Sequence, residues 1–247
     1  MKTKTIFLIT IVILIQFAFC KKNENRIKSE NLITAIYSQT LIIVDGLLNE
    51  PDWQEAQQVH LRNSDTDEQV TDTTFSTYAL TCYDKNNLYI AFVCNDRDIY
   101  SSFTNRDQHL WEEEAIEIFI DVDDEPNTYV EIELSPNNVL FDSYIVDPIN
   151  IDIEETSKFD LPGIKTAVSA NGTVNFRVDE DKSWTAEIAI SFSDIIKNFK
   201  SDILKETKWK INYYRIDRDN DGPTHYAWSP TMGRFHKPSV FGKLVFK

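Results

Sequence analysis

Apolar and polar residues alternate along this chain in short stretches that are typical of β-strands. The clearest alternation spans residues 129–134, where three apolar side chains share one face and Tyr129, Glu131 and Glu133 share the other. We expect the first face to pack in the core and the second to meet water or a ligand. Further strands are expected at residues 41–44, 75–83, 88–94, 115–122, 139–146, 173–178, 184–190, 209–216 and 241–246.

A single stretch, residues 193–199, has the pattern of a helix. Turn-forming Asn, Asp, Gly and Pro residues separate the expected strands at fairly regular intervals. Residues 75–83 and 88–94 should form a hairpin, and residues 173–178 and 184–190 a second antiparallel pair. The pattern therefore predicts an all-β fold, an antiparallel β-sandwich that is jelly-roll-like and has one short helix.

The first twenty residues have the pattern of an export signal. Lys2 and Lys4 precede an apolar run over residues 6–19, which is shorter than the about 20 apolar residues of a membrane-spanning helix. Cys20 follows the run, and the segment that ends there resembles a lipobox, although Phe19 stands where that motif has a small residue. We therefore expect lipidation of Cys20. Cleavage of an ordinary signal nearby and an uncleaved anchor are the alternatives.

These features predict three regions along the chain. Residues 1–20 are the signal peptide, residues 21–38 a polar and charged tether, and residues 39–247 one folded β-sandwich domain. The expected product is an exported, membrane-anchored lipoprotein that contacts the membrane through its N-terminal lipid, on the outer membrane or facing the periplasm.

The charge balance argues against one class of partner. The chain has a net charge of -15 and an isoelectric point near 4.7. Binding to nucleic acid needs a basic face for the phosphates, so we expect no nucleic-acid partner. The four histidines have no zinc-ligand spacing, and neither an H-E-x-x-H nor a G-x-S-x-G motif occurs.

Two cysteines beyond Cys20 fall on either side of the expected hairpin turn. In that register Cys94 faces Thr77, five residues away from Cys82 along the neighbouring strand. Five residues of strand span roughly 17 Å. A disulfide requires Cα atoms within about 7 Å of each other. We therefore expect Cys82 and Cys94 to be free and buried thiols.

Four segments, in order, carry a family resemblance: DGLLNEPDW at residues 45–53, LYIAF at 88–92, LWEEEAIEIFID at 110–121, and WSP with PSVFGKL at 228–244. Together they resemble the family 9 carbohydrate-binding modules, over residues 41–247. Asn49 and Glu114 stand where that family usually has aspartate or another acid. The resemblance implies a non-catalytic module that binds a glycan or oligosaccharide at the cell envelope and supports polysaccharide capture or degradation. It implies no certain cofactor, although such modules can carry structural calcium.

The resemblance also implies a set of ligand-binding residues. Members of the family can hold a sugar between two aromatic rings, and those positions fall on Trp111 and, with Phe in place of Trp, on Phe235. Glu117 matches the strand carboxylate that accepts sugar hydroxyls, and Glu133 stands where the family has a basic residue. Aromatic faces suit the C–H faces of a sugar, and carboxylates suit its hydroxyls.

Each of these residues also has a purely structural interpretation. Trp111 and Phe235 could be core residues, and Glu117 could lie on a solvated sheet face. For the remaining tryptophans, core packing is the favoured interpretation: Trp53, Trp184, Trp209 and Trp228.

Two acidic clusters are candidates for calcium. Residues 217–222, DRDNDG, match the first half of an EF-hand loop, which makes Asp217, Asp219 and Asp221 candidate ligands. The twelfth position of that loop is Trp228 instead of Glu, and the alternative is a polar hairpin turn ending in Asp-Gly. The second cluster, residues 121–125, follows a strand and is expected to be a solvated turn.

Three other functions remain open at the level of sequence. Glu117, Glu131 and Glu133 could lie on one sheet face and act as the paired carboxylates of a glycoside hydrolase. A haem-binding relative would need axial ligands such as Met232 and His236. The chain could also be a structural surface domain whose sugar site has decayed.

Overall fold

The computed structural model describes residues 31–198, 209–219 and 222–247. Spatial proximity divides the chain into two units, Met1–Asn31 and Leu32–Lys247, and the strands that the structure describes belong to the second. The expected signal peptide and Cys20 lie outside the described residues. Within the described ranges, no helix is both long and apolar enough to cross a membrane.

The described residues form thirteen strands, three α-helices and three 3-10 helices. Their bounds are β1 Leu32–Tyr37, α2 Pro51–Glu55, β2 Val59–His60, β3 Arg62–Asn63, η1 Thr73–Phe75, β4 Thr77–Tyr83, β5 Asn87–Asn95, η2 Leu110–Glu112, β6 Ala115–Asp121, β7 Tyr129–Leu134, β8 Leu140–Ile145, α3 Ile153–Thr156, β9 Lys165–Asn171, β10 Ser183–Ser191, α4 Phe192–Asn198, β11 Lys210–Asp219, β12 Gly222–Ala227, η3 Pro238–Val240 and β13 Gly242–Phe246.

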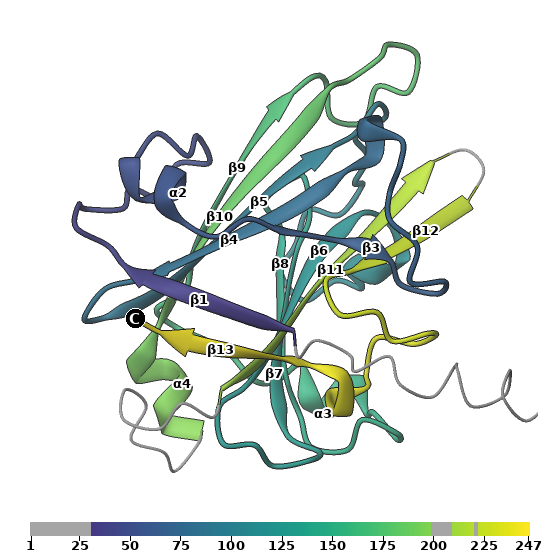
Figure 1. Cartoon of the computed structure of the whole chain (residues 1–247). Helices are drawn as coiled ribbons and strands as arrows, with labels where there is room; N and C mark the ends of the chain where they lie inside the picture. The colour runs from purple at the N-terminus through teal and green to yellow at the C-terminus, as the bar shows by residue number, and fades with distance from the viewer. Residues whose placement is uncertain (1–30, 199–208, 220–221) are drawn as a thin grey trace, which may run out of the picture. The chain divides into compact units, whose positions relative to one another are not determined.

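These strands make a two-layered β-sandwich (Figure 1). One layer has the strand order β8-β7-β6-β11-β13-β1, and the other has the order β1-β4-β5-β10-β9. β1 belongs to both layers, because its first four residues pair with β13 and its last two with β4. The all-β sandwich that the strand pattern predicts is therefore confirmed.

The core lies between the two layers and follows the alternation of each strand. On β6, Ile116, Ile118 and Ile120 point inward, and on β10 every second residue from Trp184 does the same. Trp53, Trp184, Trp209 and Trp228 are all at most 8% exposed, so their expected core role is confirmed. Because successive residues of a strand point to opposite faces, Glu117 and every second residue from it lie on the outer face of β6.

β1 departs from the expected organisation in two ways. It starts at Leu32, inside the segment 21–38 that the sequence predicts to be a polar tether. Its pairings with β13 and β4 are both parallel, so the sheet is mixed and not wholly antiparallel. Ile33 and Ala35 are fully buried. The short alternation that they create is hidden in the sequence by the polar residues around it.

Two expected strands are wrong. Residues 41–44 form no strand, because side chains bind their neighbouring backbone amides: Glu50 accepts from Ile43, and Asp52 from Thr40. Residues 173–178 form turns, and the strand beside β10 is β9. Val178 is 80% exposed, which is incompatible with a strand packed on the core.

The expected helix is α4, which starts one residue earlier than the pattern predicts. The prediction of one short helix is wrong, because α2 and α3 are two further α-helices. Each has only four or five residues, too few for a 3.6-residue period to be visible. Local signals still explain their starts: Pro51 occupies the first turn of α2, and the Asp152 carboxylate accepts from the amide of Glu155 at α3.

The expected hairpin of β4 and β5 is confirmed, with Thr77 opposite Cys94. Cys82 and Cys94 are both free and buried, as the register predicts. Burial raises the pKa of the Cys94 thiol to about 12 and raises that of Cys82 further. Both thiols are therefore protonated and unreactive at neutral pH.

Candidate functional site

The site begins with the register of β6 and β7. Glu117 on β6 lies directly opposite Glu133 on β7, and Phe119 lies opposite Glu131. All four residues point away from the core, because their neighbours of opposite parity fill it. One carboxylate oxygen from each of Glu117, Glu131 and Glu133 lies within 4.8 Å of the other two. We call these three residues the glutamate triad.

The triad is covered, in contrast to a solvated sheet face. The exposed fractions of Glu117, Glu131 and Glu133 are 2%, 3% and 1%. The triad lines a cavity of about 550 Å³, whose other walls come from η2, the start of α3, β11, β12 and the segment before η3. Trp111 and Phe235 line the same cavity. The structure therefore brings together all four residues that the family resemblance implies.

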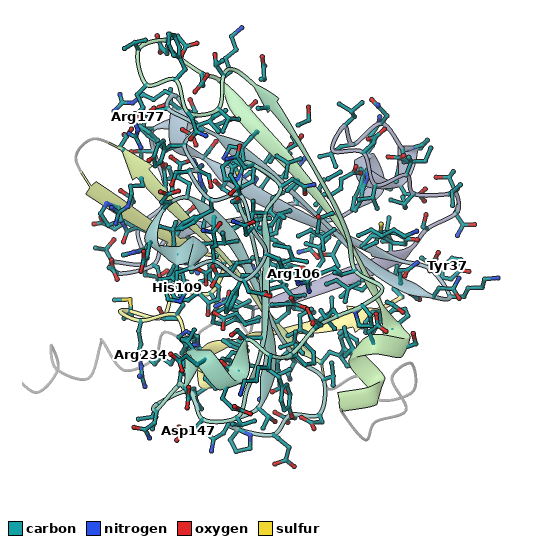
Figure 2. The ribbon with its side chains drawn as sticks, turned by 180° about the vertical axis from the view of Figure 1, so that it is seen from behind. Tyr37, Arg106, His109, Asp147, Arg177 and Arg234 are labelled. Atoms are coloured by element: carbon teal, nitrogen blue, oxygen red, sulfur yellow. The ribbon has the colours of Figure 1, made fainter. Side chains whose placement is uncertain are left out.

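Trp111 is held in η2 by aromatic contacts on two sides. His109, labelled in Figure 2, stacks on the indole with 4.4 Å between ring centroids and 19° between planes. Phe141 meets the indole edge-on at 5.3 Å. The fully buried Leu110 anchors the turn beside it. Trp111 itself is only partly buried, so its plane is fixed while part of it remains available to the cavity.

Phe235 is backed by Tyr214 of β11. Their rings stack at 4.2 Å with 19° between the planes, and the Tyr214 hydroxyl donates to the Phe235 carbonyl at 3.0 Å. His225 of β12 meets the Phe235 ring edge-on at 5.6 Å. The same tyrosine therefore positions both the ring and the backbone of Phe235.

The loop that carries Phe235 is fixed at its base. The Met232 amide donates to the Ser64 carbonyl at 2.9 Å, and the Lys237 ammonium donates to the Thr231 carbonyl at 2.9 Å. Gly233 has a φ of 140°, a conformation that side-chain-bearing residues rarely adopt. These contacts hold the loop over the triad without any regular secondary structure.

The triad has few hydrogen-bond donors of its own. The Ser143 hydroxyl donates to Glu131 at 2.8 Å, and the Trp111 backbone donates a hydrogen bond to Glu133, which offsets only part of the rise that burial causes in the pKa of Glu133. The second carboxylate oxygen of Glu133 is buried and has no partner among the described residues. Burial raises the pKa of all three glutamates: that of Glu131 reaches about 7, and the negative charges of neighbouring triad members add to the effect on Glu117 and Glu133.

His236 lies beside the triad as a neutral ring. Its Nδ1 is 2.6 Å from the Tyr129 hydroxyl, and its Nε2 is 3.7 Å from Glu131. Burial, together with the charge of Arg234 (labelled in Figure 2), lowers the pKa of His236 to about 4. The effect of burial on the pKa of His236 thus outweighs that of the nearby carboxylate. The imidazole therefore contributes no positive charge at neutral pH. Met232, the other residue of the haem hypothesis, is 58% exposed.

The candidate calcium ligands are distributed over different contacts. Asp217 faces Asp96 and Glu114 in a second buried group of three acids, and Asp219 forms an ion pair of 3.0 Å with Arg97. Asp221 lies outside the described residues. Asp219 pairs with Gly222 in the β11–β12 ladder, so this segment is a hairpin, as in the alternative interpretation.

Arg215 supplies the positive charge of that second group. It lies 2.7 Å from Asp96 and 3.3 Å from Asp217, and it also donates to the Thr77 hydroxyl at 2.9 Å. Burial raises the pKa of Glu114 to about 11, so this third acid is protonated. A buried arginine and a proton therefore offset two of the three negative charges of the second group.

The acidic cluster at residues 121–125 is not the fully solvated turn that the sequence predicts. Asp121 is 1% exposed, and its carboxylate accepts from the amides of Asp123 at 3.1 Å and Asp124 at 2.8 Å. Lys210 pairs with Asp124. These contacts give the Asp121 carboxylate hydrogen-bond donors within its own turn.

Sequence reasoning missed part of the cavity wall. Ile151 lines it just before α3 and Ile153 at the start of α3, and His236, expected only as a haem ligand, lines it from the loop. No local pattern distinguishes these residues from ordinary loop residues. Glu131 could be predicted from the sequence, because it lies two residues from Glu133 on the same face of the strand. The glycosidase hypothesis names it for that reason.

Comparisons with solved structures support the fold. A protein of Bacteroides uniformis, assigned provisionally to carbohydrate binding, has a TM-score of 0.69 and 15% identity, covering 89% of this chain and 100% of that one. A family 9 carbohydrate-binding module of Caldicellulosiruptor kristjanssonii in complex with cellotriose has a TM-score of 0.61 and 15% identity, covering 87% and 93%. Its complex with glucose gives a TM-score of 0.59 at 15% identity, covering 87% and 95%.

Sequence comparisons identify the family to which the chain belongs. An extracellular protein of Arthroderma benhamiae is 28% identical over 175 residues, which are 67% of this chain and 76% of that protein. The model of the family described as carbohydrate family 9 binding domain-like matches residues 44–247. That match covers the sandwich from the turn before α2 to the C-terminal residue, and the chain therefore belongs to the carbohydrate family 9 binding domain-like family.

Proposed function

We propose that this protein binds carbohydrate without catalysis, in the cavity formed by Trp111, Phe235 and the glutamate triad. The observation that carries the proposal is the gathering of two fixed aromatic rings and three buried carboxylates in one cavity of about 550 Å³. Small-molecule sites have volumes of about 300 to 1,000 Å³. The cavity therefore suits a monosaccharide or the end of a short oligosaccharide.

The residues that line the cavity suit both the C–H faces and the hydroxyl groups of a sugar. The C–H faces of a pyranose pack on aromatic and aliphatic groups, which Trp111, Phe235 and Ile151 provide. The hydroxyls donate hydrogen bonds, and the triad provides acceptors. The family 9 module of Caldicellulosiruptor kristjanssonii forms complexes with cellotriose and glucose, which supports a ligand of this class.

The arrangement of the carboxylates favours binding over hydrolysis. A glycoside hydrolase needs two carboxyl groups on opposite sides of the glycosidic bond, about 5 to 10 Å apart. The triad instead forms one continuous floor, because Glu117 and Glu133 are cross-strand neighbours and the oxygens lie within 4.8 Å of one another. This arrangement suits a row of acceptors for sugar hydroxyls better than two groups that flank a glycosidic bond.

We also propose export and anchoring through a lipid on Cys20, with the module supporting capture or degradation of polysaccharide at the cell envelope. The basic and apolar N-terminal pattern supports export, as does the similarity to an extracellular protein. Metabolic labelling with a fatty acid tests the anchor. Label should enter the wild type and be absent from Cys20→Ser; label in both variants would contradict lipidation at this position.

Calorimetry with mono- and oligosaccharides tests the binding function. We expect the wild type to bind at least one glycan and Trp111→Ala to lose most of that affinity while remaining folded. Phe176→Ala is the matched control, because Phe176 is an exposed aromatic residue outside the cavity lining. Absence of binding by the wild type across a broad glycan panel would support a structural domain with a decayed site. Release of reducing sugar would support a hydrolase.

A further inference from the structure

The protein contains two buried groups of three acids that differ in their source of positive charge. Asp96, Glu114 and Asp217 surround Arg215. Within the described part of the chain, the glutamate triad forms no ion pair with any Lys or Arg, and its nearest base, His236, is a neutral ring. Buried carboxylates are stable only when they are paired, protonated or bound to a metal.

The triad also presents an unused acceptor to the cavity. Glu133 is 1% exposed, lines the cavity, and has one carboxylate oxygen without a hydrogen-bond partner. Buried polar atoms of this kind are rare in folded proteins, and a bound ion is one of their explanations. Because Glu133 lines the cavity, a cation that enters the cavity reaches the residue that carries this oxygen.

We propose that the glutamate triad binds one divalent cation of the calcium class on the cavity floor, and that hydroxyls of the bound sugar complete its coordination. This inference rests on the proposed carbohydrate binding. The ion would offset two of the three negative charges of the triad, and it would replace the basic residue whose place Glu133 takes. The aromatic rings would then orient the sugar above the ion.

The chemistry of the triad selects the ion. All of its donors are carboxylate oxygens, which hard cations prefer. Calcium takes six to eight oxygens at about 2.3 to 2.6 Å, so two ligands on opposite sides of one ion are about 5 Å apart. One oxygen from each triad residue lies within 4.8 Å of the other two, which fits that limit. Three glutamates leave coordination positions free for hydroxyls or water.

A divalent ion also suits the charge better than an ammonium group does. Three carboxylates carry three negative charges when ionised. A monovalent ammonium, such as that of an amino sugar, would leave two of them buried and unbalanced, whereas a divalent ion leaves one. Burial raises the pKa of each triad member, as expected for carboxylates that form no ion pair with a Lys or Arg among the described residues.

The test uses purified protein stripped of metal with a chelator and then titrated with calcium chloride. Calorimetry and thermal unfolding measure binding of the ion without any sugar. Glu133→Gln keeps the shape of the side chain and removes its charge. Glu180→Gln makes the same change at an exposed residue, and Asp217→Asn makes a matched change in the group around Arg215.

Calcium should raise the unfolding temperature of the wild type and of both control variants, and should leave Glu133→Gln unchanged. At a calcium concentration one hundred times the Kd, the shift corresponds to about 2.7 kcal/mol. Loss of the calcium response in Asp217→Asn, with a normal response in Glu133→Gln, would overturn the assignment to the triad. The wild-type titration remains decisive even if a variant does not fold.

Glycan titrations with calcium and with chelator separate this inference from the proposed function. We expect at least a tenfold loss of glycan affinity in chelator. Equal glycan binding in both conditions, without any calcium response, would overturn the inference and leave the proposed function intact. Calcium binding without any glycan binding would support the ion site and overturn both its sugar-bridging role and the proposed function. Selective binding of glucosamine over glucose in chelator would overturn the inference in favour of an ammonium ligand.

Discussion

Glu117 and Glu133 are direct partners across β6 and β7, and both carboxylates are buried on the cavity floor. Like charges opposite each other in a sheet are destabilising, and sheet alternation offers neither side chain another direction. The pair therefore opposes folding whenever both groups are ionised. This cost has no structural purpose in the sandwich, which supports a role in binding.

Glu133→Gln should stabilise the protein in the presence of a chelator. The change removes one of two facing charges and keeps the volume of the side chain, so we expect a gain of about 0.2 to 1 kcal/mol in the free energy of unfolding at pH 8. Urea denaturation measures it, with Glu180→Gln as the exposed control. A clear loss of stability in Glu133→Gln alone would mean that the carboxylate makes a stabilising contact within the protein.

Part of this site could be predicted from the sequence because it follows strand alternation and motif spacing. Glu117 and Glu133 lie on strands with an unambiguous period of two, and Trp111 and Phe235 follow from motifs around them. Their meeting in one cavity depends on long-range register, which no local pattern encodes. The same limit explains why β1 was missed, because its parallel pairing joins distant segments of the chain.

Two other differences from the expected strands have separate physical reasons. The strand β9 has no strongly apolar alternation, since its residues are small or polar and none is fully buried. The run at residues 41–44 is apolar enough for a strand, but the carboxylates of Glu50 and Asp52 bind the amides of Ile43 and Thr40. Tertiary contacts thus decide both cases against local propensity.

Tyr214→Phe should loosen the loop that carries Phe235. The variant keeps the stacked ring but loses the hydroxyl that donates to the Phe235 carbonyl at 3.0 Å. We expect a loss of about 0.5 to 1.5 kcal/mol in stability and weaker glycan binding. Calorimetry and denaturation measure the two effects. Tyr78→Phe on β4 is the control, and equal glycan affinity in wild type and Tyr214→Phe would show that the hydrogen bond does not position the ring.

Arg215→Met should destabilise the protein far more than the removal of a surface arginine. The Arg215 side chain is fully buried, and its loss would leave Asp96 and Asp217 without their positive partner, at a cost of about 3 to 5 kcal/mol. Arg97→Met removes a half-exposed partner of Asp219 and should cost about 1 kcal/mol or less. Urea midpoints measure both variants. Similar midpoints would mean that buried water or protonation compensates for the missing arginine.

Asp121 should make the folded protein less stable as the pH rises. Burial raises the pKa of Asp121 from 3.8 to about 7, so between these values the folded state binds a proton that the unfolded chain has released. The stability from this group is therefore present at low pH and lost as the pH rises through that interval, a loss on the order of 2 to 4 kcal/mol. Asp121→Asn keeps an acceptor for the amides of Asp123 and Asp124 and cannot ionise.

The variant should consequently equal the wild type near pH 4 and exceed it in stability at pH 8. Urea denaturation at intervals of pH between 4 and 8, in chelator, measures the difference in slope. Glu125→Gln, at an exposed position in the same turn, should leave the slope of the wild type unchanged. Parallel pH profiles for Asp121→Asn and the wild type would mean that the Asp121 carboxylate is ionised in the folded protein, held there by the amides of its own turn and by Lys210.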